Sequence, residues 1–207
     1  MKIEFNAERH EYTVDGRIVP SVTEIIKYLT IDTFATANPI LKQIAADLGT
    51  RVHESTVLYD YIGDDMEVYD HDVYPFIKAY SRFVRDYGIK GYVFSEHIIS
   101  NGEYAGTLDR LAIIDGQLTV IDLKTGTTSN PRAFAAQLYG YAKILSDSYG
   151  YRIEDIKGLI VKLKKDGTYS AVYYDLNRGK EFFDACLGLW KMTQEDKKTH
   201  GRNSNRT

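Results

Sequence analysis

Apolar residues recur along the chain in two rhythms, and each rhythm predicts one kind of element. Runs of period two, rich in Val, Ile, Tyr and Phe and bounded by Gly, Asn or Asp, predict strands. Runs with apolar positions three and four residues apart predict helices. The expected strands cover residues 2–5, 11–19 with a bend, 92–100, 103–114, 117–124, 158–163 and 168–174. The expected helices start at residue 21 and cover 38–62, 72–87, 130–146 and 178–193.

Polar residues that cap helices support these boundaries. Ser21 precedes Glu24 with the spacing of a capping box. The dipeptides Asn38-Pro39 and Asn130-Pro131 each combine a capping residue with a proline in the first turn. Strands and helices thus succeed one another within one module, which predicts an α/β (α+β) fold with a mixed central β-sheet flanked by helices.

The dipeptide Asp115-Gly116 separates two apolar runs and is a strong signal for a two-residue hairpin turn. If the residues that flank this turn face each other, Asp109 lies directly opposite Asp122 on the neighbouring strand. Lys124 then points to the same face as Asp122, because side chains alternate with a period of two. Nearer the turn, the same face carries four residues expected in the core: Leu111, Ile113, Leu118 and Val120.

Two carboxylates opposite one another on adjacent strands repel, so pairing Asp109 with Asp122 is a poor structural choice unless a cation lies between them. Mg²⁺ and other hard cations prefer carboxylate oxygens, often together with waters and phosphate oxygens. A lysine beside such an ion can hold a water and offset charge on a phosphate. Asp109, Asp122 and Lys124 therefore predict a metal-dependent catalytic site.

A second hairpin signal, Asn101-Gly102, joins the preceding strand to this hairpin. A two-residue loop there places Glu96 opposite Thr107 and on the same face as Asp109. Glu96 is therefore a candidate additional member of the site. A single bulge in either hairpin would turn it to the other face.

Two of the predicted helices carry further candidates. Gln137 and Tyr141 are four residues apart on one face of the helix that follows Lys124, where they could contact a phosphate or a base. The alternative is that Tyr141 belongs to the core and Gln137 to its solvent edge. His53 lies within the long helix and could supply a nitrogen ligand, although a lone helical histidine is more often structural or exposed.

Composition limits the classes of protein that fit. A length of 207 residues with 43% hydrophobic content allows one domain, expected over residues 1–195, followed by a disordered polar tail over 196–207. The net charge of −3 neither requires nor excludes a polyanionic partner. The single Cys186 excludes an internal disulfide and an iron–sulfur site held by cysteines. The sequence shows no signal peptide and no membrane span, so a cytoplasmic protein is expected.

The candidate residues resemble the motifs of the PD-(D/E)XK nuclease superfamily, in its RecB-type and phage exonuclease branch. The shared motifs, in order, are Gly106-x-x-Asp109, Asp122-x-Lys124 with Thr125-Gly126, and Gln137-x-x-x-Tyr141. Upstream, the resemblance includes Gly49-x-x-x-His53 and Pro20-Ser-Val-Thr23, a segment similar to one in mitochondrial genome-maintenance exonucleases. Leu108 stands where the family name has proline.

The resemblance implies a restriction-endonuclease-like core and a nuclease that acts on DNA. It implies Mg²⁺ or Mn²⁺ bound by His53, Asp109, Asp122 and the backbone carbonyl of Leu123. It also implies that Lys124 positions the attacking water, that Gln137 and Tyr141 help to hold the DNA strand, and that the product carries a 5′-phosphate. Several relatives hold an iron–sulfur cluster with four cysteines, which this chain cannot do.

An exonuclease in phage or bacterial DNA recombination, repair or replication is the first expectation, with DNA and other recombination or replication proteins as partners. A structure-specific endonuclease is the second. A catalytically inactive nuclease-fold DNA-binding protein remains open, as does a general phosphate-processing or structural protein. Metal-dependent degradation of labelled DNA separates these classes.

Overall fold

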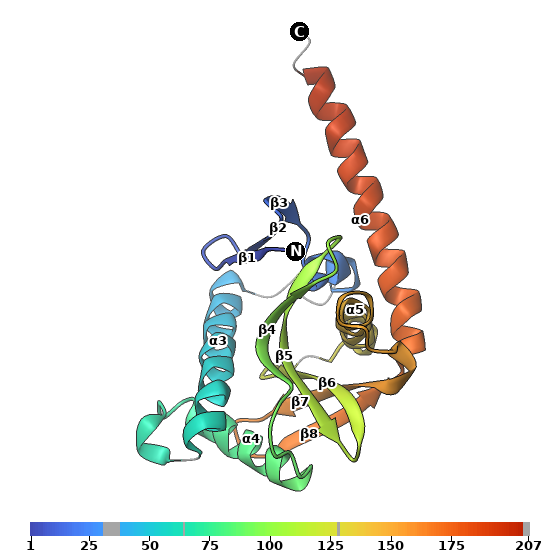
Figure 1. The fold of residues 1–207 in the computed structure, drawn as a ribbon. Helices are drawn as coiled ribbons and strands as arrows, with labels where there is room; N and C mark the ends of the chain where they lie inside the picture. Colours follow the sequence, from blue (N-terminus) through green and yellow to red (C-terminus); the bar gives the residue numbers. More distant parts are fainter. Residues whose placement is uncertain (31–37, 64, 128, 205–207) are drawn as a thin grey trace.

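The computed structural model describes residues 1–30, 38–63, 65–127 and 129–204, with the backbone alone described at residue 66 and over 197–204. Its strands form two sheets, and helices lie on both faces of the larger one (Figure 1). The fold is therefore α+β with a mixed sheet flanked by helices, as predicted.

The larger sheet contains, in spatial order, β4 (Phe94–Ser100), β5 (Ala105–Ile114), β6 (Gln117–Lys124), β7 (Ile156–Leu163) and β8 (Tyr169–Tyr174). Neighbours are antiparallel except β6 and β7, which are parallel and are connected through helix α5 (Pro131–Tyr149). A parallel pair needs such a crossover, because a hairpin can join only antiparallel strands. The smaller, antiparallel sheet contains β1 (Ile3–Asn6), β2 (Glu11–Val14) and β3 (Arg17–Val19).

The other helices are α1 (Val22–Ile25), α3 (Pro39–Ile62), α4 (Tyr74–Asp86) and α6 (Leu176–Ser204), with 3₁₀ turns at Ile26–Leu29, Met66–Val68 and Ile153–Asp155. The three predicted caps are confirmed. The side-chain oxygens of Ser21, Asn38 and Asn130 accept hydrogen bonds from first-turn amides at 2.9, 2.9 and 3.1 Å. Within the described ranges, none of these helices combines the length and the apolar character needed to cross a bilayer.

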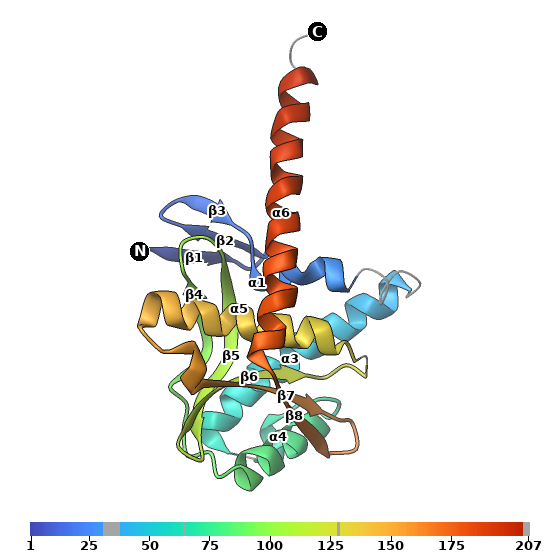
Figure 2. The ribbon, with the colours of Figure 1, turned by 90° about the vertical axis from the view of Figure 1, so that its right-hand side faces the viewer.

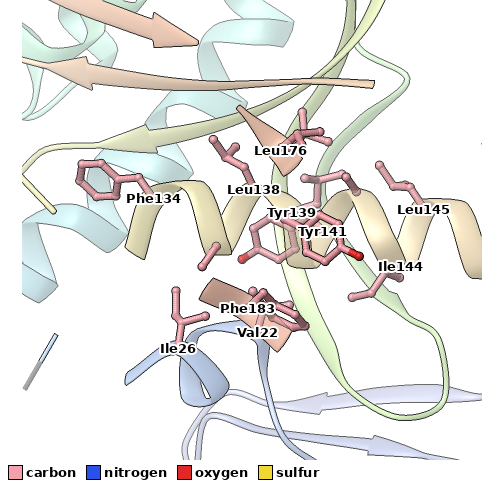
Figure 3. Packing of buried hydrophobic residues seen from close by; sticks show 14 of the residues in the cluster. Val22, Ile26, Phe134, Leu138, Tyr139, Tyr141, Ile144, Leu145, Leu176 and Phe183 are labelled. Carbon is pink, nitrogen blue, oxygen red and sulfur yellow. The ribbon is translucent and has the colours of Figure 1, made fainter. Parts of the chain in front are cut away.

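Helices α1, α5 and α6 form a hydrophobic core with one face of the larger sheet (Figure 3). The core is centred on α5, where Leu138, Tyr141 and Ile144 are buried. Gly140 shows how closely the helices approach. A Cβ at this position would lie 2.7 Å from Phe183 of α6 and 2.9 Å from Val22 of α1, so glycine permits both contacts.

Helices α3 and α4 cover the opposite face of the larger sheet. Phe76, Tyr80 and Phe83 of α4 are buried there against a second core cluster. That cluster includes Ile121 of β6 and Leu159 of β7. The central strands are therefore covered on both faces, which explains their nearly continuous apolar sequence.

One predicted register is wrong. The loop at Asn101-Gly102 has four residues, 101–104, instead of two, because the last paired residues of β4 and β5 are Ser100 and Ala105. The Asn101 side chain accepts hydrogen bonds from two amides of this loop, at 3.1 and 3.2 Å, and so stabilises the longer turn. Thr107 therefore faces Ile98 and not Glu96. The error is two residues, so Glu96 stays on the predicted side of the strand.

The core prediction for the β5–β6 hairpin is correct only away from its turn. Leu111 and Val120 are fully buried, whereas Leu118 is half-buried and Ile113 is 62% exposed. The helices that cover this face thus protect the hairpin only over the part far from the turn. Ile113 lies outside that cover, so its expected place in the core is wrong.

Helix α6 continues beyond its contact with α5 and projects away from the rest of the molecule toward the C-terminus (Figure 2). Its backbone stays helical to Ser204, past the predicted end near Thr193, and residues 205–207 lie outside the described residues. Glu195, Lys197 and Lys198 are of residue types that favour helix, so polarity alone does not mark a helix end. The division of the chain into one domain and a tail stays a prediction.

Candidate metal centre and cleft

The β5–β6 hairpin has the predicted register. Its turn, Asp115-Gly116, has φ values of 50° and 78°, the positive values that such a two-residue turn requires. The paired ladder ends with Arg110 opposite Ile121, so Asp109 and Asp122 occupy the next position. The amide of Leu123 donates a hydrogen bond to Asp109 Oδ2 at 2.7 Å, which ties one carboxylate to the strand that carries the other.

Asp122 and Lys124 form an ion pair at the end of β6. Lys124 Nζ lies 2.7 Å from Asp122 Oδ2. Among the described residues, this buried oxygen has that ion pair but no hydrogen bond of regular geometry. Burial raises the pKa of the Asp122 carboxyl to about 6, and the charge of Asp109 acts in the same direction against Lys124. Such an oxygen is available to a cation.

Charge keeps the Lys124 ammonium protonated in spite of its position. Burial lowers the pKa of Lys124, but the charges of Asp122 and Asp109 outweigh this effect, so that pKa is raised. Burial likewise raises the pKa of Asp109, with Glu96 adding to the rise and His53 opposing it. At this end of the hairpin, several acidic groups thus surround one amine.

His53 of α3 reaches the carboxylates of β4 and β5. Its Nδ1 lies 3.2 Å from Glu96 Oε1 and 3.6 Å from Asp109 Oδ1. One ligand atom from each of His53, Glu96 and Asp109 lies within 4.8 Å of the other two. Burial lowers the pKa of His53, but the two carboxylates outweigh it and raise that pKa to about 9. Asp122 is not part of this triad and lies beside it.

Glu96 is held by Arg110, a residue that sequence reasoning missed. Glu96 has a φ of 44°, an uncommon conformation for a residue with a side chain and a sign of local constraint. Arg110 Nη1 donates to Glu96 Oε1 at 3.2 Å and to the carbonyl of Asp109 at 2.7 Å. The available signal was a charged residue inside an apolar strand. Its partners Asp60 and Tyr80 lie on distant helices, which no local pattern reveals.

Gln137 and Tyr141 both project from α5 into the site. Lys124 Nζ donates to Gln137 Oε1 at 3.1 Å, and Gln137 Nε2 donates to the Tyr141 hydroxyl at 3.4 Å. Both residues are buried, so the solvent-edge alternative for Gln137 is wrong, because its amide bridges two site residues. Tyr141 belongs to the core and to the site at once. A Cβ on Gly106 would lie 2.8 Å from the Tyr141 ring, so glycine makes room for it.

One cleft of about 750 Å³, a size typical of ligand sites, is lined by the candidate site residues His53, Glu96, Asp109, Asp122, Lys124, Gln137 and Tyr141. Gly49, Ser21 and Thr23, which belong to the two upstream motifs, line it as well. The structure therefore brings all five predicted motifs to one place. The small sheet adds three aromatic residues that sequence reasoning did not assign to the site: Phe5, His10 and Tyr12.

The donor set fits a hard divalent cation. Carboxylates of Glu96, Asp109 and Asp122 supply oxygens of the kind that suit Mg²⁺ and Mn²⁺, and His53 supplies one imidazole nitrogen. Within the described part of the chain, the buried Asp122 Oδ2 has an ion pair with Lys124 but no hydrogen bond of regular geometry. Leu123 uses its amide at Asp109, and the role of its carbonyl as a ligand stays a prediction.

No protein-family model matches the sequence, and a comparison with curated proteins finds no significant match. The family resemblance therefore rests on the motif residues alone. The geometry of the cleft is the evidence on which a function can be proposed.

Proposed function

We propose that this protein is a metal-dependent nuclease of the PD-(D/E)XK superfamily that hydrolyses phosphodiester bonds of DNA. The observation that carries the proposal is the convergence of Asp109, Asp122 and Lys124 in one cleft, where an oxygen of Asp122 has no hydrogen bond of regular geometry from any described residue. The three carboxylates of Glu96, Asp109 and Asp122 also outnumber His53 and Lys124, which pair with them, and this supports a site for a further cation. The mixed sheet, with both acids on its central hairpin, supports a restriction-endonuclease-like core.

Each residue has a role that follows from its position. His53, Glu96, Asp109 and Asp122 would hold Mg²⁺ or Mn²⁺. When bound, the ion supplies positive charge against the phosphate and lowers the pKa of an attacking water. Lys124, held between Asp122 and Gln137, is placed to orient that water and to donate hydrogen bonds to a phosphate oxygen.

Gln137 and Tyr141 act as positioning groups in this proposal. Gln137 accepts from Lys124 and donates to Tyr141, so it fixes the amine in the cleft. Displacement of the leaving 3′ oxygen yields a 5′-phosphate. From the resemblance, we propose an exonuclease of phage or bacterial recombination, repair or replication, acting in the cytoplasm. A structure-specific endonuclease is the second candidate.

The direct test compares linear, nicked and closed-circular DNA, labelled at either end, with Mg²⁺, Mn²⁺ or EDTA. We expect degradation of linear DNA that depends on the metal and stops with EDTA. Attack on closed circles would instead indicate an endonuclease. DNA that is bound but never cut under any of these conditions would refute the enzymatic proposal.

Matched variants test the assignment of the residues. Asp122→Asn and Lys124→Ala should each lower the cleavage rate at least about a hundredfold. Asp115→Asn removes an exposed carboxylate from the turn of the same hairpin, and Lys165→Ala removes an exposed lysine, so both should keep the wild-type rate. Wild-type rates in the two cleft variants would sink the assignment.

A further inference from the structure

Three aromatic rings form one wall of the cleft. Phe5 of β1 stacks on Tyr12 of β2 with ring centroids 4.6 Å apart and an angle of 30° between the planes. His10, in the turn between these strands, meets Phe5 edge-on at 5.3 Å and Tyr12 edge-on at 6.2 Å. All three line the same cleft as Asp109, Asp122 and Lys124, so an aromatic surface faces the proposed metal site.

This aromatic wall is fixed to the strand that carries the metal ligand. The Tyr12 hydroxyl lies 2.9 Å from Thr107 Oγ1 on β5, two residues before Asp109. Tyr12 is only 3% exposed and packs with Ala105 of β5, so it acts as the anchor. Phe5 is half-buried and His10 is exposed, and these two rings remain accessible.

The charges in the cleft do not favour binding of a long phosphate backbone. Among the described residues that line it, the acidic ones outnumber the basic ones: Glu54, Glu96, Asp109 and Asp122 against Lys124, His10 and His53. His53 is already paired with two of these carboxylates. A bound ion can compensate at the scissile phosphate, but few cations remain for neighbouring phosphates. Affinity for a DNA strand must then come in large part from contacts with its bases.

We propose that Phe5 and His10 form a stacking platform for an unpaired nucleobase, so that DNA enters the cleft as a single strand. This rests on the proposed nuclease function, which places a phosphate at Asp109 and Asp122. Aromatic faces stack on bases of any sequence, because every base has a π-face. In a duplex those faces are covered by neighbouring base pairs. The platform therefore selects single-stranded DNA or a frayed end.

Substitutions can remove the accessible aromatic rings while keeping the fold of the small sheet. Phe5→Leu keeps an apolar side chain in the packing but loses the aromatic face. His10 has a φ of 50°, a conformation that Asn tolerates well, so His10→Asn removes the ring and keeps the backbone. Phe5→Trp retains an aromatic face as the conservative variant. Tyr173→Leu, on a half-exposed aromatic of β8 outside the cleft, is the matched control.

The first readout is steady-state cleavage of a single-stranded oligonucleotide. Phe5→Leu should raise KM about tenfold while kcat changes by less than about twofold, and His10→Asn should act in the same direction. Phe5→Trp, which keeps an aromatic face, should restore a low KM relative to Phe5→Leu, and Tyr173→Leu should match the wild type. Blunt duplex DNA offers an unpaired base only when its end frays, so the wild type and every variant should cut it more slowly than the single strand.

The second readout does not require cleavage. A fluorescent purine analogue placed near the end of a single strand should be quenched by the wild-type protein with Ca²⁺, and Phe5→Leu should abolish the quenching. A strand with an abasic site at that position keeps its phosphates. It should bind the wild type about tenfold more weakly than the intact strand, whereas Phe5→Leu should bind both strands equally. Thermal unfolding of each variant shows whether the small sheet remains intact.

The outcomes separate the two proposals. Cleavage by the wild type with unchanged KM and unchanged quenching in Phe5→Leu would overturn the platform and leave the nuclease in place. Quenching that depends on Phe5, in a protein that cuts no DNA, would overturn the nuclease and keep the base-binding surface. Equal binding of abasic, single-stranded and blunt duplex DNA would also overturn the platform.

Discussion

Asp109 and Arg110 are neighbours on β5, yet their side chains enter two different buried polar clusters. Arg110 is fully buried and donates to Asp60, Tyr80, Thr56, Glu96 and the carbonyl of Asp109. Asp109 instead meets other acids, and the nearby Asp122 has an oxygen without a hydrogen bond among the described residues. In the first cluster the donors of Arg110 all have acceptors, whereas in the second a buried carboxylate oxygen has no hydrogen bond among the described residues.

This difference separates a structural polar cluster from one prepared for a ligand. Buried charge is tolerated when partners and hydrogen bonds compensate it, as around Arg110. Where compensation is incomplete, the missing partner is expected to be a bound group. Glu96 belongs to both clusters, because its Oε1 accepts from Arg110 and faces His53. The structural cluster thus positions a member of the candidate metal centre.

Removing Arg110 should have the largest effect on stability. Arg110→Met leaves Asp60 and Glu96 without their buried cation, so the free energy of unfolding should fall by about 3–5 kcal/mol in urea denaturation. Arg152 also pairs with two carboxylates, but its side chain is 69% exposed. Arg152→Met should therefore cost less than about 1 kcal/mol. Equal, small losses in the two variants would contradict the structural role of Arg110.

The acidic cluster should bind Mn²⁺ more tightly as the pH rises. His53, with a pKa raised to about 9, must lose its proton to act as a ligand, as must Asp122 with its pKa of about 6. Between these two values His53 must release a proton when it binds the metal, so the apparent affinity should rise by about tenfold per pH unit. Calorimetric titration of EDTA-treated protein measures this slope. An affinity independent of pH over that range would exclude His53 as a ligand.

Without metal, Asp122→Asn should stabilise the protein. The folded-state pKa of Asp122 is about 6, above its ordinary value of 3.8, so folding favours the neutral carboxyl. That contribution is complete below the ordinary value and is lost as the pH rises through about 6. Asn keeps the neutral form at every pH. Thermal unfolding in EDTA should show a gain of about 1–3 kcal/mol above pH 7 and none near pH 4.

The matched control for this change is Asp115→Asn, which neutralises an exposed carboxylate on the same hairpin. Asp115→Asn should leave the difference in unfolding free energy between high and low pH as it is in the wild type. A wild-type protein more stable than Asp122→Asn at both pH values would mean that the ion pair with Lys124 outweighs the burial of the carboxylate.

The smallest effect should come from Glu96→Gln. The amide oxygen can still accept from Arg110, so stability should change by less than about 1 kcal/mol. The loss of one negative charge beside His53 should weaken Mn²⁺ binding about tenfold. Calorimetry and urea denaturation of the same preparation measure both quantities. A large loss of stability with unchanged metal affinity would place Glu96 in the structural cluster alone.

The predictions that the structure confirms rest mostly on short-range sequence signals. The Asp115-Gly116 turn fixed the register that brings Asp109 and Asp122 together, because its backbone conformation depends on those two residues. The capping residues marked helix starts for the same reason. Asn101-Gly102 gave the wrong loop length, since the Asn101 side chain stabilises a longer turn through bonds that the dipeptide does not specify.

The rest of the site depends on contacts between distant segments. Arg110 finds Asp60 and Tyr80 only because α3 and α4 cover that face of the sheet. The aromatic wall reaches the cleft only because the small sheet docks on β5 through Tyr12. Neither arrangement follows from periodicity, which describes each element by itself. The exposure of Ile113 and the length of α6 depend in the same way on where neighbouring elements end.

Because of the strand order, the two halves of the candidate metal centre should differ in local stability. Glu96 lies on β4, at the edge of the five-stranded sheet, whereas Asp122 lies on β6, at its middle. Edge strands fray at lower free energy than central ones, and they exchange their amide hydrogens sooner. In mild denaturant, Glu96 on β4 should therefore be lost as a ligand first, while the β5–β6 hairpin with Asp109 and Asp122 remains folded.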